Sequence, residues 1–206
     1  LSVSRRIGEG ERLVRSKAWT GWCPTHMLST KVTGKKLGFI GFGRIAQAVA
    51  QKAHFGFGME VSFYDPYPPS DEIIKKFSAK KFDTLEDVLK DSDYVTLHCP
   101  GGGDNTNLMN KERFSLMKKS AFLINTARGD IVNETDLVNF LKKNPQARMA
   151  TDVLADEVRS RLESPLLRYA KDNNQVTITQ HIGGMSREAQ EIAYGHAAIR
   201  LQAFFL

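Results

Sequence analysis

The stretch Lys36-Leu-Gly-Phe-Ile-Gly-Phe-Gly-Arg-Ile-Ala46 joins a short apolar run to a glycine-rich turn and the start of a helical pattern. Gly41 permits a tight turn, and Gly43 leaves the backbone open to an approaching anion. Ala46 is small enough for the following helix to pack closely against the preceding strand. Free N–H groups at the start of that helix attract an anion. The stretch therefore predicts a strand, a phosphate-binding turn and a helix.

The residues after this turn extend the pattern to a dinucleotide site. Apolar residues between Ile45 and Phe55 recur at helical spacing. Val61-Ser-Phe-Tyr-Asp65 is a second strand that ends in an acid, near the ~20-residue spacing of a ribose-binding carboxylate. Asp65 would also repel a 2′-phosphate, so the sequence favours NAD over NADP. A glycine turn can also bind nothing, but its position between a strand and a helix favours a binding site.

Outward from this unit, apolar runs alternate with amphipathic stretches along the chain. Thr84 is placed to cap one helix, with Asp87 three residues later, and Asn110 is placed to cap another. Strands that are apolar on both faces indicate a parallel sheet covered by helices on both sides. The sequence thus predicts an α/β fold with a doubly wound parallel sheet of the Rossmann type. We expect further strands at 94–98, 121–125, 149–153 and 176–179, helices at 1–17, 84–90, 110–119, 133–143 and 186–205, and an irregular segment at 19–33.

Composition places the chain among ordinary globular proteins. Its 206 residues are 41% hydrophobic and 25% charged, which suffices for one well-buried domain. No apolar run reaches the ~18 residues of a membrane-spanning helix, and no secretory signal peptide is recognisable. The net charge of +6 is scattered among acids, which disfavours nucleic acid as a partner. Cys23 and Cys99 predict no disulfide framework, which fits a reducing cytoplasm.

Three of the predicted strands are followed by side chains suited to hydride transfer. Arg128 follows the strand at 121–125 and can bind a carboxylate through two parallel hydrogen bonds. Glu157 follows the strand at 149–153, and His181 follows the strand at 176–179. An imidazole exchanges protons near neutral pH, and a carboxylate beside it would stabilise its protonated form. Each residue alone is a weak signal, but their placement at one sheet edge predicts an active site there. We expect no metal in it.

These residues lie in segments that resemble the D-isomer-specific 2-hydroxyacid dehydrogenase family over nearly the whole chain. The family includes glyoxylate and hydroxypyruvate reductases and D-lactate, phosphoglycerate and formate dehydrogenases. The resemblance implies an NAD-dependent oxidoreductase that transfers a hydride between nicotinamide and a small D-2-hydroxyacid or 2-oxoacid. The matching segments are Gly34-Lys-Lys-Leu-Gly-Phe-Ile-Gly-Phe-Gly-Arg-Ile45, Leu97-His-Cys-Pro100, Leu123-Ile-Asn-Thr-Ala-Arg-Gly129, Asp152-Val153, Ser164-Pro-Leu-Leu167 and His181-Ile-Gly-Gly184.

The resemblance also assigns roles to residues. It implies that Arg128 binds the 2-oxoacid, that His181 is the general acid and base, and that Glu157 tunes His181. The implied cofactor contacts are Gly41, Gly43, Arg44 and Ile45 at the pyrophosphate, Asp65 at the ribose, Cys99 and Pro100 near the adenosine, and Thr126, Ala127, Arg128, Asp152, His181 and Gly183 towards the nicotinamide.

The sequence departs from the family pattern at a few positions. Val158 and Gln180 stand where the family commonly has proline, and Ala46 replaces the third glycine of the turn. The segment Gly101-Gly-Gly-Asp-Asn105 replaces a more usual Leu-Thr-Pro-Glu stretch and is similar to a subgroup of glyoxylate-reductase-like members. None of these changes removes a reacting group.

The resemblance further implies a second domain. Residues 1–17 and 186–206 would be the two interdomain helices of a single NAD-binding domain, and the substrate domain would lie outside this chain. Such a chain is expected to bind NAD but to turn over substrate poorly, because hydride transfer needs water excluded. The family usually forms homodimers, and Trp19 to Trp22 is either a contact of that kind or ordinary packing. Two other functions remain open: an NAD-sensing, non-enzymatic binding module, and a hydrolase with tightly held NAD, which offers no role for Arg128 and Glu157.

Overall fold

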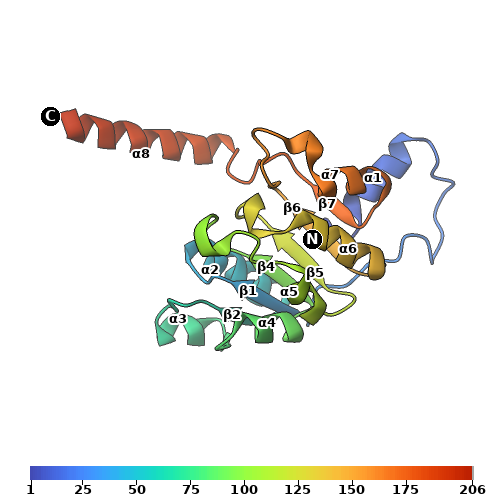
Figure 1. Cartoon of the computed structure of the whole chain (residues 1–206), viewed down its shortest axis with the longest axis horizontal. Helices are drawn as coiled ribbons and strands as arrows, with labels where there is room; N and C mark the ends of the chain where they lie inside the picture. The colour runs from blue at the N-terminus through green and yellow to red at the C-terminus, as the bar shows by residue number, and fades with distance from the viewer. Residues whose placement is uncertain (206) are drawn as a thin grey trace.

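The apolar runs of the sequence form the strands of a parallel sheet in a computed structural model that describes residues 1–205 (Figure 1). The strands are β1 (Lys36–Ile40), β2 (Glu60–Tyr64), β3 (Lys80–Lys81), β4 (Tyr94–Leu97), β5 (Phe122–Asn125), β6 (Arg148–Thr151) and β7 (Val176–Ile178). The helices are α1 (Ile7–Arg15), α2 (Arg44–Gln51), α3 (Asp71–Lys76), α4 (Leu85–Asp91), α5 (Lys111–Leu116), α6 (Glu134–Lys143), α7 (Pro165–Asp172) and α8 (Arg187–Phe205).

The strand order explains where a ligand would bind. The seven strands lie in the order β3-β2-β1-β4-β5-β6-β7, and every pair is parallel. The chain therefore winds outward from β1 to β3, crosses over, and winds the other way from β4 to β7. Between β1 and β4 the loops diverge at the carboxyl ends of the strands, which is where doubly wound sheets bind ligands. The predicted α/β fold of the Rossmann type is confirmed.

Two apolar cores cover the two faces of the sheet. One contains residues of α4, α5, α6 and α7, and the other contains residues of α2 and of the segment around Val3. Alternation along β1 sends Phe39 into the second core and Ile40 into the first. Gly38 lets α4 lie close to the sheet, because a Cβ there would come within 2.1 Å of Ser92 Oγ. The strands are therefore held between helices on both sides, and their carboxyl ends are fixed relative to one another.

Most predicted elements are present, with corrections at their ends. Thr84 and Asn110 cap α4 and α5, and each side chain accepts a hydrogen bond from the backbone N–H three residues later. The helix expected at 1–17 is confined to α1, and the one expected at 110–119 ends at Leu116. The helical pattern from Ile45 continues beyond α2 as a π-helical turn, Lys52–Gly56. Three further elements, α3, β3 and α7, were not predicted.

The last helix differs from the others in its surroundings. In Figure 1, α8 extends away from the sheet, and its side chains are mainly exposed. Exposed apolar residues along it include Ile192 and Ile199, at 61% and 64% of their full area. Across the described part of the chain, we find no helix with the length and apolarity to span a lipid bilayer.

Candidate cofactor and active site

The turn after β1 has the geometry that its glycines predict. Gly41 has a φ of 86°, a left-handed conformation in which a side chain would be strained. A Cβ on Gly41 would also lie 2.9 Å from the backbone of Cys99, so the glycine lets the end of β4 pack against the turn. At Gly43 a Cβ would meet nothing within 4 Å, and this residue caps α2. The start of α2 is therefore accessible, and the fully buried Ala46 anchors the same helix in the core.

Asp65 lies at the end of β2 and faces this turn. Its Oδ2 accepts a hydrogen bond from the Phe42 N–H at 2.6 Å, and its Oδ1 accepts one from the Tyr67 N–H at 2.8 Å. Each carboxylate oxygen has a further lone pair, so the half-buried group can still accept from ribose hydroxyls. The acid therefore orders the glycine-rich turn and keeps lone pairs free to accept further hydrogen bonds.

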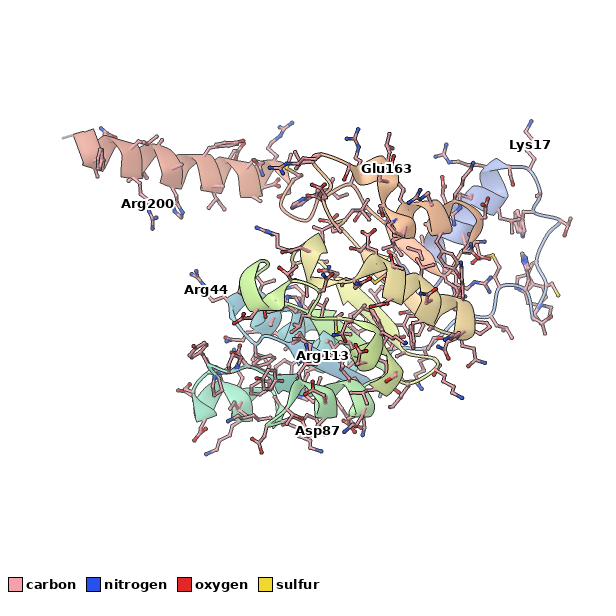
Figure 2. All side chains as sticks on the ribbon, in the orientation of Figure 1. Lys17, Arg44, Asp87, Arg113, Glu163 and Arg200 are labelled. Atoms are coloured by element: carbon pink, nitrogen blue, oxygen red, sulfur yellow. The ribbon has the colours of Figure 1, made fainter. Side chains whose placement is uncertain are left out.

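Other residues assigned to the dinucleotide lie around the same edge. Arg44 and Ile45 are exposed at the start of α2, and Arg44 points outward in Figure 2. Cys99 and Pro100 follow β4, where burial raises the pKa of the Cys99 thiol. A largely protonated thiol is a small apolar neighbour and not a nucleophile.

The turn after β5 is held by Asn125, a buried residue that the sequence analysis did not single out. Its side-chain amide donates to the Arg128 carbonyl at 2.8 Å, and its oxygen accepts from the Ala127 N–H at 3.0 Å. Thr126 and Arg128 are exposed on this turn, and the Arg128 guanidinium donates to the Ala127 carbonyl. Asn125 stands in the same N-x-x-R-G motif as Arg128, so its place in the motif was a signal for this role.

Arg128 and Glu157 line one open pocket. The pocket has a volume of about 350 Å³ and lies between the turns that follow β5 and β6. Gly101 borders it, and a Cβ on Gly101 would lie 2.8 Å from the Arg128 Cβ. The glycine-rich segment after Pro100 therefore lies directly against the stem of the arginine.

His181 is brought to the same place by a contact with Glu157. The distance from His181 Nδ1 to Glu157 Oε1 is 2.5 Å, and Glu157 Oε2 accepts from the Leu154 N–H at 3.2 Å. His181 has a φ of 59°, in the left-handed region. Half of its side chain is exposed, compared with 29% for Glu157. The imidazole is thus oriented through Nδ1, and its Nε2 lies on the other side of the ring.

Asp152 fixes the turn on which His181 lies. Its carboxylate accepts hydrogen bonds from the Thr179 hydroxyl, the Ile182 N–H at 3.0 Å and the Gly183 N–H at 2.8 Å. Burial opposes ionisation, but these hydrogen bonds outweigh it and lower the pKa of Asp152. Asp152 is therefore a fixed negative charge that joins the ends of β6 and β7.

The structure places all the residues assigned from sequence at the carboxyl edge of the sheet. It joins Glu157 to His181 directly and puts Arg128 and Glu157 around one pocket. Two structural supports lacked a sequence signal: Thr179, and Glu134, a buried acid that hydrogen-bonds the segment before Glu157. Their roles depend on contacts between distant segments, which spacing along the chain does not reveal.

Comparison with known proteins is consistent with this geometry. Residues 1–183 match the family model described as D-isomer specific 2-hydroxyacid dehydrogenase, NAD binding domain. A glyoxylate reductase of Pyrococcus horikoshii is 38% identical over 195 residues, which cover 93% of this chain and 56% of that protein. The chain belongs to the D-isomer-specific 2-hydroxyacid dehydrogenase family, as its NAD-binding domain.

Solved structures show the same relationship. The TT0316 protein of Thermus thermophilus aligns with a TM-score of 0.80 and 35% identity, covering 93% of this chain and 57% of that one. The D-lactate dehydrogenase of Aquifex aeolicus, complexed with NAD and lactic acid, aligns with a TM-score of 0.85 and 27% identity, covering 99% and 62%. The chain thus spans little more than half the length of these relatives.

Proposed function

We propose that this chain is the cofactor-binding half of an NAD-dependent oxidoreductase that acts on small D-2-hydroxyacids or 2-oxoacids. The observation that carries the proposal is the contact of Glu157 with His181 beside the pocket that Arg128 lines. An acid–base group, a carboxylate that orients it and a guanidinium for the substrate are what reversible reduction of a 2-oxoacid needs from a protein. The glyoxylate reductase among the relatives favours a substrate of that size.

The turn after β1 fits the dinucleotide. The empty space at the Cβ position of Gly43 and the start of α2 suit a pyrophosphate, and the Asp65 carboxylate suits ribose hydroxyls. We assign the contacts at the pyrophosphate to Gly41, Gly43, Arg44 and Ile45, and those towards the nicotinamide to Thr126, Ala127, Asp152 and Gly183. The negative charge of Asp65 favours NAD over NADP.

The reaction divides among three side chains. The bound nicotinamide supplies or accepts the hydride. Arg128 binds the substrate carboxylate through paired hydrogen bonds and holds the 2-carbon in place. His181 donates a proton from Nε2 to the substrate oxygen during reduction, and takes it back during oxidation. Glu157 holds Nδ1, which fixes the orientation of the ring and directs Nε2 away from the carboxylate.

A second domain completes the site in our proposal. The relatives are much longer than this chain, and the Arg128 pocket is open. Hydride transfer requires a closed site, so the chain alone is expected to bind NADH and to reduce glyoxylate only slowly. Rapid turnover by the isolated 206 residues would contradict this division of labour.

The decisive experiment is a panel of 2-oxoacids with NADH and NADPH, run on the protein that includes its substrate domain. The proposal predicts oxidation of NADH with at least one small 2-oxoacid and loss of that activity in His181→Ala, with NADH binding retained. Tight NADH binding without turnover of any 2-oxoacid would favour the alternative, an NAD-sensing binding module.

We further propose a homodimer and a cytoplasmic location. Trp19 and Trp22 are 51% and 84% exposed in the segment between α1 and β1, which suits a contact with a second copy. Two free thiols, those of Cys23 and Cys99, suit a reducing compartment. A sedimentation experiment that compares the wild type with Trp22→Ala tests the dimer contact.

A further inference from the structure

A buried carboxylate below the active-site edge has no part in the proposed chemistry. Glu134 is the first residue of α6 and is only 6% exposed. Its Oε1 accepts from the Ala155 N–H at 2.9 Å, and its Oε2 accepts from the Ser164 hydroxyl at 2.5 Å and the Leu166 N–H at 3.5 Å. Burial of a carboxylate is unfavourable unless hydrogen bonds compensate for lost water. Here all three donors come from one segment, between β6 and the first turn of α7.

That segment carries Glu157 between the two points that Glu134 holds. Ala155 lies two residues before Glu157, and Ser164 lies at the far end, where its hydroxyl also caps α7 by accepting from the Leu167 N–H. The middle of the segment lacks apolar anchors, since Val158 is 85% exposed and Leu162 is 71% exposed. Figure 2 shows Glu163 at the outer edge of the same segment. Its two ends are therefore the main attachments of the Glu157 segment to the fold.

The hydrogen bonds continue from Glu134 to the imidazole. The Ala155 N–H donates to Glu134, and the preceding N–H, that of Leu154, donates to Glu157. Glu157 in turn contacts His181. Close packing supports this arrangement, because a Cβ on Gly129 would lie 2.0 Å from the Leu154 carbonyl oxygen. Neighbouring backbone amides thus join one buried carboxylate to one that faces the active site.

We propose that Glu134 is a positioning residue, which together with Ser164 holds Glu157 in hydrogen-bond contact with His181. The inference deepens the proposed function and rests on it for its catalytic consequence. It also gives a role to the Ser164-Pro-Leu-Leu167 segment, which the reaction itself does not use. Glu134 does not touch substrate or cofactor in this assignment, and it acts through the placement of Glu157.

The test replaces Glu134 without changing its size. Glu134→Gln keeps one oxygen but puts an NH₂ group opposite a donor, so at least one of the three hydrogen bonds is lost. Asp136→Asn is the matched control, because Asp136 lies on the same helix and accepts a backbone hydrogen bond from Lys111, on another segment. Two measurements on the 206-residue chain, which need no substrate, report the contact. They are the low-field NMR resonance of the His181 Nδ1 proton and amide hydrogen exchange of residues 154–166.

We expect Glu134→Gln, like Glu157→Gln, to weaken or abolish the resonance, and to speed amide exchange of Ala155 about tenfold or more. Asp136→Asn should leave both as in the wild type. A wild-type resonance and wild-type exchange in Glu134→Gln would overturn the proposal. If that variant fails to fold, Ser164→Ala tests the same link, with Thr84→Ala as a control that removes a helix cap elsewhere.

The catalytic consequence is measured separately. In the protein with its substrate domain, Glu134→Gln should lower kcat by about 10- to 100-fold with the Kd for NADH unchanged, because small displacements of catalytic groups have effects of that size. Glu134→Asp, which keeps the charge but is shorter, should recover part of the loss. A change in NADH affinity with unaltered kcat would contradict the positioning role. If the wild type transfers no hydride, the proposed function fails, whereas the NMR and exchange results still decide the structural link.

Discussion

Two sides of the carboxyl edge of the sheet carry different chemistry, one around β1, β2 and β4 and the other around β5, β6 and β7. Around β1, β2 and β4 lie backbone amides, the Asp65 carboxylate and exposed positions of the glycine-rich turn. Around β5, β6 and β7 lie a guanidinium and a linked pair of carboxylate and imidazole. The first side suits binding of a dinucleotide, and the second suits proton and hydride transfer.

Two histidines illustrate the difference. Both follow a strand, β4 or β7. His98 is half-buried, its Nε2 lies 3.0 Å from Thr96 Oγ1, and its ring lies 5.6 Å from that of Phe39. Burial lowers the pKa of His98 to about 4, so it is neutral at physiological pH. His181 is exposed and contacts Glu157. The surroundings of a histidine, and not its position after a strand, decide whether it can serve as an acid.

The largest expected effect separates these histidines directly. His181→Asn should lower kcat by about 10²- to 10⁴-fold, because it removes the proton donor, while leaving the Kd for NADH unchanged. His98→Asn is the matched variant and should keep kcat within a few-fold of the wild type. Steady-state kinetics with a small 2-oxoacid provide the measurement. An equal loss of kcat in the two variants would show that His181 and His98 do not differ in their role in the reaction.

Arg128→Lys should reduce kcat/KM for the 2-oxoacid by roughly 10- to 100-fold, because a lysine cannot form the paired hydrogen bonds of a guanidinium. NADH affinity, followed by fluorescence titration, should stay the same. Arg168→Lys, on α7, is the control, since Arg168 bonds the Glu163 carbonyl away from the pocket. A loss of NADH affinity with unchanged substrate affinity would show that Arg128 serves dinucleotide binding and not substrate binding.

His98 should make the fold less stable in mild acid. Its pKa is about 4 in the folded state and 6.5 when unperturbed, so below pH 6.5 the unfolded chain binds the proton more readily. Above pH 6.5 the residue contributes nothing, and stability is lost as pH falls from 6.5 towards 4. The loss is about 2 kcal/mol near pH 5. Urea unfolding at several pH values should show a flatter profile for His98→Gln, and an unchanged slope would refute this explanation.

The smallest effect concerns cofactor choice. Asp65→Ser should weaken NAD binding and strengthen NADP binding by about tenfold each, equivalent to ~1.4 kcal/mol, because the charge that repels a 2′-phosphate is gone. Asp83→Ser, which changes an acid just after β3, is the control. Calorimetric titration with both dinucleotides distinguishes the outcomes. An unchanged NAD-to-NADP ratio would show that Asp65 only orders the turn through Phe42.

The sequence predicts the parts of this molecule that local chemistry determines. Helix caps such as Thr84 and Asn110 and the turn at Gly41 are encoded within a few residues, so these elements were found. The strand β3 consists of two lysines that pair with β2 at the sheet edge, and no apolar pattern marks it. Glu134 looks like an ordinary acid in the first turn of a helix. Only the fold places Ala155 and Ser164 beside it, so its role follows from the three-dimensional structure and not from the sequence pattern.

The left-handed backbone at His181 implies a compromise between durability and reactivity. Such a conformation disfavours most residues by about 1–2 kcal/mol relative to glycine, which adopts it freely. A glycine at this turn would relieve the strain and remove the imidazole to which we assign the proton transfer. Selection for heat resistance alone should therefore favour His181→Gly, a change that raises stability and removes the proposed activity.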